Sequence, residues 1–303
     1  RYGLIPVFVW YNLPDGGESY TTDLSHAQSK GYMQAYFKDL KNFLTDVQDV
    51  LGDDLYGVIL EPDFLGYMQQ LSGKQPDQIK SVVNLTRDVH GAVDGYTLRD
   101  SYVTATYDSG HYVFSNTLDE GIAGEGDGTI TDLVQAINYV IKTHGGNVWF
   151  GWQLNLWADS IGAGVKGVMR MTDADNPGNY SWSGARGFIR QKAESITRYA
   201  LSAGILGSDA DFISIDKYGL DAMGHQNRSN PHDSTWFFNS DHWHNYLLFV
   251  KTMHNTAAKP IVLWQLPIGH INSSKSVSAY TGLNFSPLDN SNRKYEDSTV
   301  SWF

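Results

Sequence analysis

The stretch GVILEPDFLGYM, residues 57–68, ends an apolar run in two carboxylates that flank a proline. Residues 58–60 have the composition of a buried parallel strand, because such strands are apolar on both faces. Glu61 and Asp63 then follow at the carboxyl edge of the sheet, where α/β proteins carry their functional residues. A single Asp after a strand is also a common cap of the next helix, so both interpretations of Asp63 are open at this point.

Similar apolar runs alternate along the chain with amphipathic segments. The predicted strands cover residues 5–14, 55–63, 101–111, 147–157, 211–219 and 259–270, with a seventh candidate at 164–171. The predicted helices cover residues 32–52, 76–93, 129–146, 184–204 and 242–258. This alternation in a chain of 303 residues favours an α/β fold. We expect one domain over residues 1–303, a distorted (β/α) barrel of about seven parallel strands that is similar to a TIM barrel.

The charge balance and residue content exclude several classes of function. The chain has 22 Lys and Arg against 33 Asp and Glu, and this net charge of -11 disfavours nucleic acid and anionic membranes as partners. No apolar stretch approaches the roughly 20 residues of a membrane-spanning helix. The absence of cysteine excludes disulfides and thiolate catalysis. No signal peptide is visible before the first strand, and we expect a processed protein that is secreted or periplasmic.

Aromatic residues are frequent, at 13% of the chain, and many follow predicted strands or lie in polar loops. Flat aromatic rings suit sugars, whose C–H faces stack on them while the hydroxyl groups bind carboxylates and amides. Packing in the core is the alternative interpretation for many of these rings. The long loops at 115–128 and 220–240 are candidate lids or walls of a binding site.

The ends of the predicted strands carry polar and aromatic side chains that a barrel would bring to one mouth. The candidate catalytic carboxylates are Asp63, Asp216, Asp108 and Asp15. The candidate substrate-binding residues are Trp10, Tyr11, Glu61, His111, Gln153, Asn155, Trp157, Lys217, Trp264 and Gln265. Paired carboxylates with aromatic walls are what glycoside hydrolysis requires, because one acid protonates the leaving oxygen and the other activates water or attacks the sugar. No phosphate-binding loop, serine elbow or H-E-x-x-H motif is present, and we expect no cofactor and no metal.

Three stretches in order resemble glycoside hydrolase family 6, the cellulases and cellobiohydrolases. They are VFVWYNLPDG at 7–16, VILEPDFLGYM at 58–68 and TATYDSGHYVF at 104–114. The family carries Tyr-x-Leu-Pro-Asp, Ile-Glu-Pro-Asp-Ser-Leu and Tyr-x-Asp-Ala-Gly-His in these places. The resemblance implies a distorted barrel of roughly seven strands that cleaves β-1,4-glucan with inversion. It also implies that Asp63 is the general acid and that Tyr11 lies close to the scissile sugar.

The second catalytic group is not given by the resemblance. Gly16 and Gly17 stand where the family has Arg and an Asp that supports the acid, and the family's late Gly-Gly-Glu-Cys-Asp-Gly motif is absent. Asp216 is our first candidate for the missing base, and we expect it within about 10 Å of Asp63. Glu61 is expected to orient the acid or to bind an amide at a strand end, because it points to the opposite face from its neighbours in an extended segment.

These observations predict a monomeric glycoside hydrolase that acts on a β-linked polysaccharide or oligosaccharide. Two alternatives remain open. One is a glycan-binding barrel without catalysis, and the other is a retaining glycosidase with Glu61 or Asp216 as the nucleophile.

Overall fold

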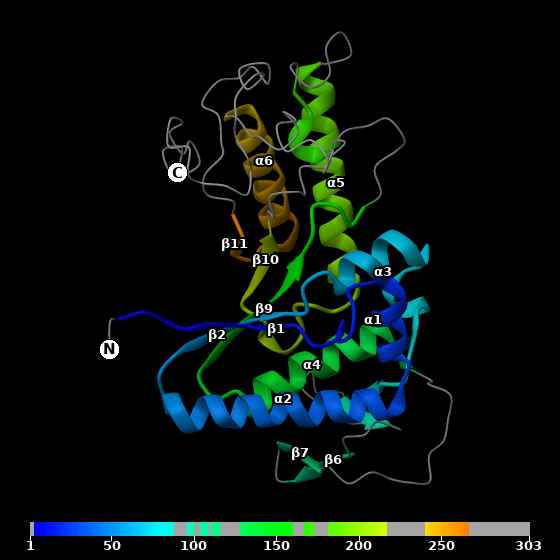
Figure 1. Ribbon diagram of the computed structural model, residues 1–303, viewed down its shortest axis with the longest axis vertical. Coiled ribbons are helices and arrows are strands. Elements are labelled where there is room, and N and C mark those ends of the chain that lie inside the picture. Colours follow the sequence, from blue (N-terminus) through cyan, green and yellow to red (C-terminus); the bar gives the residue numbers. More distant parts are fainter. Residues whose placement is uncertain are drawn as a thin grey trace. The chain divides into compact units, whose positions relative to one another are not determined.

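Five strands of the computed structural model form one parallel sheet in the order β1-β2-β9-β10-β11 (Figure 1). They are β1 (Val7–Trp10), β2 (Tyr56–Leu60), β9 (Val148–Leu154), β10 (Phe212–Asp216) and β11 (Ile261–Trp264). The spatial order follows the chain, so each strand is added beside the one before it, as in a barrel. The predicted α/β class with a parallel sheet is confirmed. The strands that the structure describes do not close into a barrel, and the seven-stranded barrel stays a prediction.

The structure describes residues 3–87, 96–99, 104–108, 111–115, 128–159, 167–172, 181–216 and 240–266. The chain divides into two compact units, and the expectation of a single domain stays a prediction. The first unit comprises residues 1–154 and 198–213, and the second comprises residues 155–197 and 214–303. No helix in the described ranges is both long enough and apolar enough to cross a membrane.

Six α-helices are described. They are α1 (Tyr20–Ala27), α2 (Lys30–Leu51), α3 (Phe64–Ser72), α4 (Ile130–His144), α5 (Trp182–Ser202) and α6 (Ser240–Ala257). Three short 3-10 helices are η1 (Pro76–Gln78), η2 (Val168–Arg170) and η3 (Gly207–Asp209). The predicted helices at 32–52, 129–146, 184–204 and 242–258 are therefore confirmed to within a few residues, whereas α1 and α3 were not predicted.

One face of the sheet in the first unit is covered by α2 and α4, which lie side by side along it (Figure 1). The rings of Phe8 and Trp10 lie 5.5 and 5.3 Å from that of Phe43 on α2. Trp152 Nε1 donates to Asn138 Oδ1 on α4 at 2.7 Å. Because side chains alternate along a strand, the residues next to Trp10 and Trp152 point to the opposite face, which is also buried in the central strands, as Ile59 and Gln153 show.

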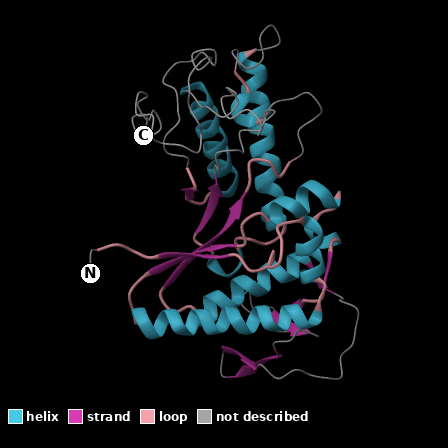
Figure 2. Cartoon of the chain, viewed as in Figure 1, coloured by secondary structure: helices cyan, strands magenta, loops and turns pink. Residues whose placement is uncertain are grey.

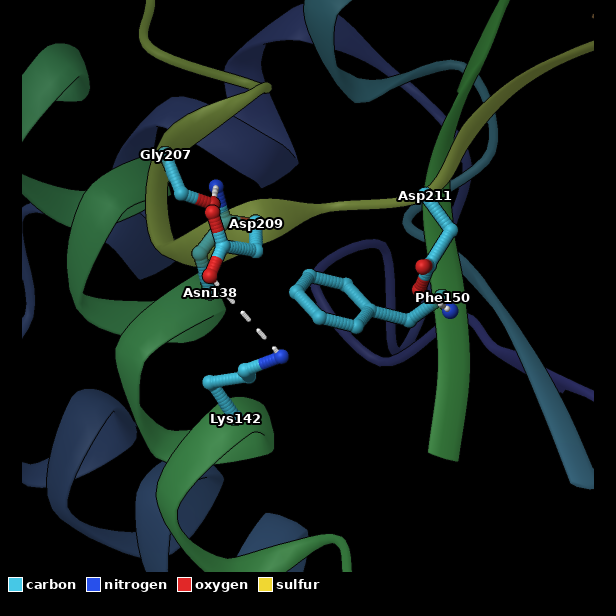
Figure 3. Close-up of polar contacts among 6 residues, drawn as sticks. All are labelled: Asn138, Lys142, Phe150, Gly207, Asp209 and Asp211. Atoms are coloured by element: carbon cyan, nitrogen blue, oxygen red, sulfur yellow. Dashed lines mark hydrogen bonds and ion pairs between the residues drawn. The ribbon is translucent and has the colours of Figure 1, made fainter. Parts of the chain in front are cut away.

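The corner between α4 and η3 is held by one amide side chain (Figure 3). Asn138 Nδ2 donates to the carbonyl oxygens of Gly204, Ile205 and Gly207 at 3.1, 3.3 and 3.2 Å. Its Oδ1 accepts the bond from Trp152, so both ends of the amide are occupied. The amide thus fixes the loop that leads from α5 into β10.

In the second unit, α6 packs against η2 through another amide. Asn245 Nδ2 donates to the carbonyl oxygens of Met169 and Met171, each at 3.0 Å. In the same unit, Lys192 on α5 forms an ion pair with Asp159 at 3.0 Å.

The predicted helix at 76–93 is wrong. Within its described part, residues 76–87, only Pro76–Gln78 is helical, and β3 (Lys80–Ser81) and β4 (Asn84–Arg87) follow it. β3 pairs antiparallel with β8 (Gly128–Thr129), and β4 pairs antiparallel with β5 (Tyr96–Arg99). The physical reason is the β-branched content of this segment, in which Val82, Val83 and Thr86 favour extended backbone over helix.

The predicted parallel strand at 101–111 is also wrong. β6 (Thr104–Asp108) pairs antiparallel with β7 (His111–Ser115) in a separate two-stranded sheet (Figure 2). Only two residues, Ser109 and Gly110, separate the two strands in the sequence. A two-residue connection that contains Gly is typical of a β-hairpin, but the expectation of a regular α/β repeat led to the prediction of a single strand. The candidate strand at 164–171 fails as well where it is described, because Val168–Arg170 is a 3-10 helix that follows Gly167.

Candidate active site

The Glu-Pro-Asp turn between β2 and α3 has an unusual backbone. Glu61 and Asp63 have φ values of 41° and 69°, in the left-handed region that costs residues other than glycine about 1–2 kcal/mol each. Asp63 precedes the first residue of α3, yet its side chain makes no capping hydrogen bond. The capping interpretation of Asp63 is therefore not supported.

Asp63 is held by a tyrosine from the neighbouring strand. Tyr11 follows β1 directly, and its O–H donates to Asp63 Oδ2 at 3.1 Å. Burial, then the charges of Asp63 and Glu18, raise the pKa of Tyr11 well above its ordinary value. The phenol therefore keeps its proton over the working pH range and acts as a hydrogen-bond donor to the carboxylate.

A second carboxyl interacts with Asp63 electrostatically, and our sequence analysis missed it. Asp23 lies in the first turn of α1, is fully buried, and neither of its oxygens has a hydrogen-bond partner in the structure. Burial, then the charges of Asp63 and Glu18, raise the pKa of Asp23 to about 7. In sequence it resembles an ordinary acid near a helix N-terminus, after the N-cap Ser19, and no local pattern distinguishes it from one.

Glu61 has a different environment, in which its carboxyl group is saturated with donors. It is fully buried, and it accepts hydrogen bonds from the backbone N–H of Leu13 at 3.1 Å, that of Asn12 at 3.3 Å and Tyr36 O–H at 2.7 Å. Burial raises its pKa to about 8, although these hydrogen bonds oppose the shift. The prediction that Glu61 binds a strand-end amide is confirmed. Because both oxygens are occupied, this geometry disfavours Glu61 as a nucleophile or as a direct ligand of substrate.

The other predicted site residues of the first unit lie in several environments. Trp10 packs against the rings of Phe43 and Tyr36 on the covered face of the sheet, which favours a core role over sugar stacking. Asp15 is exposed in the loop after β1. Gln153 is fully buried near the end of β9, and neither its Nε2 nor its Oε1 has a partner in the structure.

Asp108 and His111 face each other as a register pair in the β6–β7 hairpin. They were chosen as the end of a parallel strand of the main sheet, and that reason is overturned by the hairpin. Their place in the candidate site has no structural support.

The remaining predicted residues belong to the second unit. Asp216 ends β10 and is buried, Asn155 is buried, and Trp157 and Trp264 are half-buried. Gln265 follows β11 directly, is exposed, and has a φ of 50°. Lys217 lies outside the described residues, as do most of the loops at 115–128 and 220–240. The approach of Asp216 to Asp63 stays a prediction.

Comparison with protein-family models, curated proteins and solved structures finds no match. The resemblance to the cellulase family therefore rests on the three short stretches alone. In the described part of the chain, no three His, Asp or Glu side chains are grouped so that they could hold a metal ion.

Proposed function

We propose that the protein is a glycoside hydrolase that acts on a β-linked polysaccharide, with β-1,4-glucan as the first candidate, and that Asp63 is its general acid. The observation that carries the proposal is the state of the Asp63 carboxyl. It caps no helix, it accepts the Tyr11 O–H, and it interacts with the charge of the buried Asp23. A carboxyl group that is held at the end of a strand by a hydrogen-bond donor and has a second carboxyl near it offers the proton-transferring group that glycoside hydrolysis requires.

The geometry suggests a role for each group in an inverting reaction. Tyr11 donates to Oδ2 of Asp63 and so orients the carboxyl group that would protonate the leaving glycosidic oxygen. Asp23 and Asp63 repel each other when both are ionised, and this repulsion adds to burial in raising the pKa of Asp23. Asp23 would thus support the acid in this chain, where Gly17 stands in place of the family's supporting Asp.

The water that attacks the sugar needs a base on the opposite face, and Asp216 remains our candidate for it. Asp216 as the nucleophile of a retaining enzyme is the alternative that the described contacts leave open. The sequential order of the parallel strands supports the barrel of about seven strands that this chemistry commonly uses. The proposal includes a secreted or periplasmic monomer that binds no nucleic acid.

The proposal is tested by incubation with cellulose, mixed-linkage glucan, xylan, mannan and chitin, with released reducing ends as the readout. We expect cleavage of at least one, and a loss of at least about 100-fold in turnover for Asp63→Asn without loss of the folded state. Asp46→Asn, an exposed site on α2, is the matched control and should keep full activity. Turnover of an activated aryl glycoside should fall less in Asp63→Asn than turnover of the polysaccharide, because the aryl leaving group needs less protonation.

Three results would overturn the proposal or part of it. Wild-type rates in Asp63→Asn would remove Asp63 from the mechanism. Oligosaccharide binding without cleavage of any polymer would favour the glycan-binding barrel. Absence of both binding and cleavage would count against any carbohydrate function.

A further inference from the structure

The backbone of Asn12 and Leu13 is bound almost entirely by side chains. Glu61 accepts from both N–H groups. Tyr32 O–H donates to the carbonyl oxygen of Asn12, and His26 Nδ1 lies 2.6 Å from that of Leu13. Since a carbonyl oxygen only accepts, Nδ1 of His26 carries the hydrogen. All four polar backbone groups of this dipeptide are therefore bound by three side chains, which we call the loop clamp. One backbone bond adds to them, from the N–H of Asp15 to the carbonyl oxygen of Asn12 at 3.3 Å.

Members of the loop clamp also contact one another and a neighbouring tyrosine. The rings of His26 and Tyr32 are stacked, with centroids 3.6 Å apart and planes inclined by 3°. Tyr36, one turn after Tyr32 on α2, donates to the far oxygen of Glu61 at 2.7 Å. The clamp thus joins α1, α2 and the turn after β2.

Backbone groups in proteins are mostly satisfied by other backbone groups, so a dipeptide held by side chains is unusual. Its place in the chain gives the reason. The residue before the dipeptide is Tyr11, whose O–H meets Asp63, and Glu61 stands two residues before Asp63. The clamp therefore fixes both partners of the Tyr11–Asp63 hydrogen bond relative to each other. Catalytic groups need such support to within a fraction of an ångström.

We infer that Glu61 is a positioning residue, whose buried carboxyl holds the Asn12–Leu13 backbone in the place where Tyr11 meets Asp63. This inference rests on the proposed function and specifies how the general acid of that site is kept in register. It differs from the alternative that Glu61 attacks or binds the sugar, since Glu61 acts here only through Tyr11.

The test compares two changes at Glu61. Glu61→Leu removes both acceptors and leaves two amides without partners, and we expect kcat to fall at least about tenfold with KM within about twofold. Glu61→Gln can accept from the amides with its oxygen and donate to Tyr36 with its nitrogen, so most of the turnover should return. Tyr11→Phe should lower kcat by as much as Glu61→Leu does. The double variant should lower kcat no further than either single variant, because both changes disrupt the same Tyr11–Asp63 interaction. Additive losses would overturn the inference.

Amide exchange tests the clamp without substrate. Glu61→Leu should speed hydrogen exchange at Asn12 and Leu13 by at least about tenfold, and Glu61→Gln should change it little. Unchanged exchange would overturn the inference even if the protein is a hydrolase. Faster exchange in Glu61→Leu, together with no cleavage of any polysaccharide by the wild-type protein, would support the clamp and refute the proposed function. If Glu61→Leu does not fold, Tyr32→Phe provides the test, because it removes the bond from Tyr32 to the Asn12 carbonyl. It should lower kcat and speed exchange at Asn12 and Leu13 by smaller factors. No change in either quantity would overturn the inference.

Discussion

Two buried polar side chains of the first unit, Glu61 and Asn138, bind loop backbone in opposite senses. Glu61 accepts from two amides and a phenol. Asn138 donates to three carbonyl oxygens and accepts from an indole. Each region also contains two residues other than glycine in left-handed backbone, so strain alone does not identify a functional site.

The two regions differ in the charges around the buried group. The partners of Asn138 are neutral, and the charged pair near it, Lys142 with Asp209, is exposed with 4.0 Å between Nζ and Oδ2 (Figure 3). Near Glu61 are two further carboxyls, Asp63 and the buried Asp23, and Asp23 has no hydrogen-bond partner among the residues that the structure describes. The burial of Asn138 is thus balanced by neutral hydrogen bonds, whereas the carboxyls around Glu61 include one whose burial is not balanced, which is more typical of a functional site.

The largest effect that separates the two regions should come from Asn138→Leu. The change leaves Trp152 Nε1 and three carbonyl oxygens without their partner, and we expect a loss of about 3 kcal/mol in the free energy of unfolding. Lys142→Ala removes only the exposed ion pair and should cost under about 0.5 kcal/mol. Denaturant unfolding measures both. Turnover of the folded Asn138→Leu variant should equal that of wild type, and a fall of tenfold would mean that this corner also serves the site.

An intermediate effect is expected at Asp23, where it depends on pH. The folded pKa of about 7 lies above the ordinary value of 3.8, so the folded state binds the extra proton. The contribution of Asp23 to stability is therefore complete below about pH 4 and is lost as pH rises through 7. Asp23→Asn cannot ionise and should gain at least about 1 kcal/mol relative to wild type between pH 4 and pH 8.

Thermal unfolding at several pH values checks this prediction. The stability of Asp23→Asn should still fall somewhat as pH rises. The reason is that the pKa of Glu61 is also raised, to about 8, so the contribution of Glu61 to stability is lost over a similar pH range. Parallel pH curves for wild type and Asp23→Asn would show that Asp23 has a partner or is solvated, and the comparison of the two regions would lose its basis.

The sequence predicted the strand–helix units well where the apolar residues followed one clear spacing, that of a buried strand or that of a helix. The apolar run before Glu61 gave β2, and the spacing of apolar residues gave α2, whose buried residues recur every three or four positions. It failed between 76 and 115, where β-branched residues and a hairpin signal at Gly110 were overridden by the expectation of a regular βα repeat.

For the candidate site, the sequence identified the residues that follow strands but not the residue supplied by a helix. Tyr11, Glu61 and Asp63 were found because they end apolar runs. Asp23 was not, since only the folded chain reveals that its carboxyl is buried beside another. The role of Trp10 was also not predictable from the sequence. Alternation along the strand places Trp10 and Tyr11 on opposite faces of the sheet, but the sequence does not say which of the two faces α2 and α4 cover.

The smallest effect on binding is therefore expected for Trp10→Phe. Its ring packs against Tyr36 and Phe43 on the side of the sheet that α2 covers, as Trp152 packs against α4. The smaller ring should cost about 1 kcal/mol of stability and change oligosaccharide affinity less than about twofold. Calorimetric titration with a soluble β-linked oligosaccharide measures the second quantity, with Trp264→Phe as the comparison at a strand end whose side chain is half-buried. A loss of affinity above about fivefold in Trp10→Phe would show that this indole stacks on a sugar, and the covered face would then belong to the site rather than to the core.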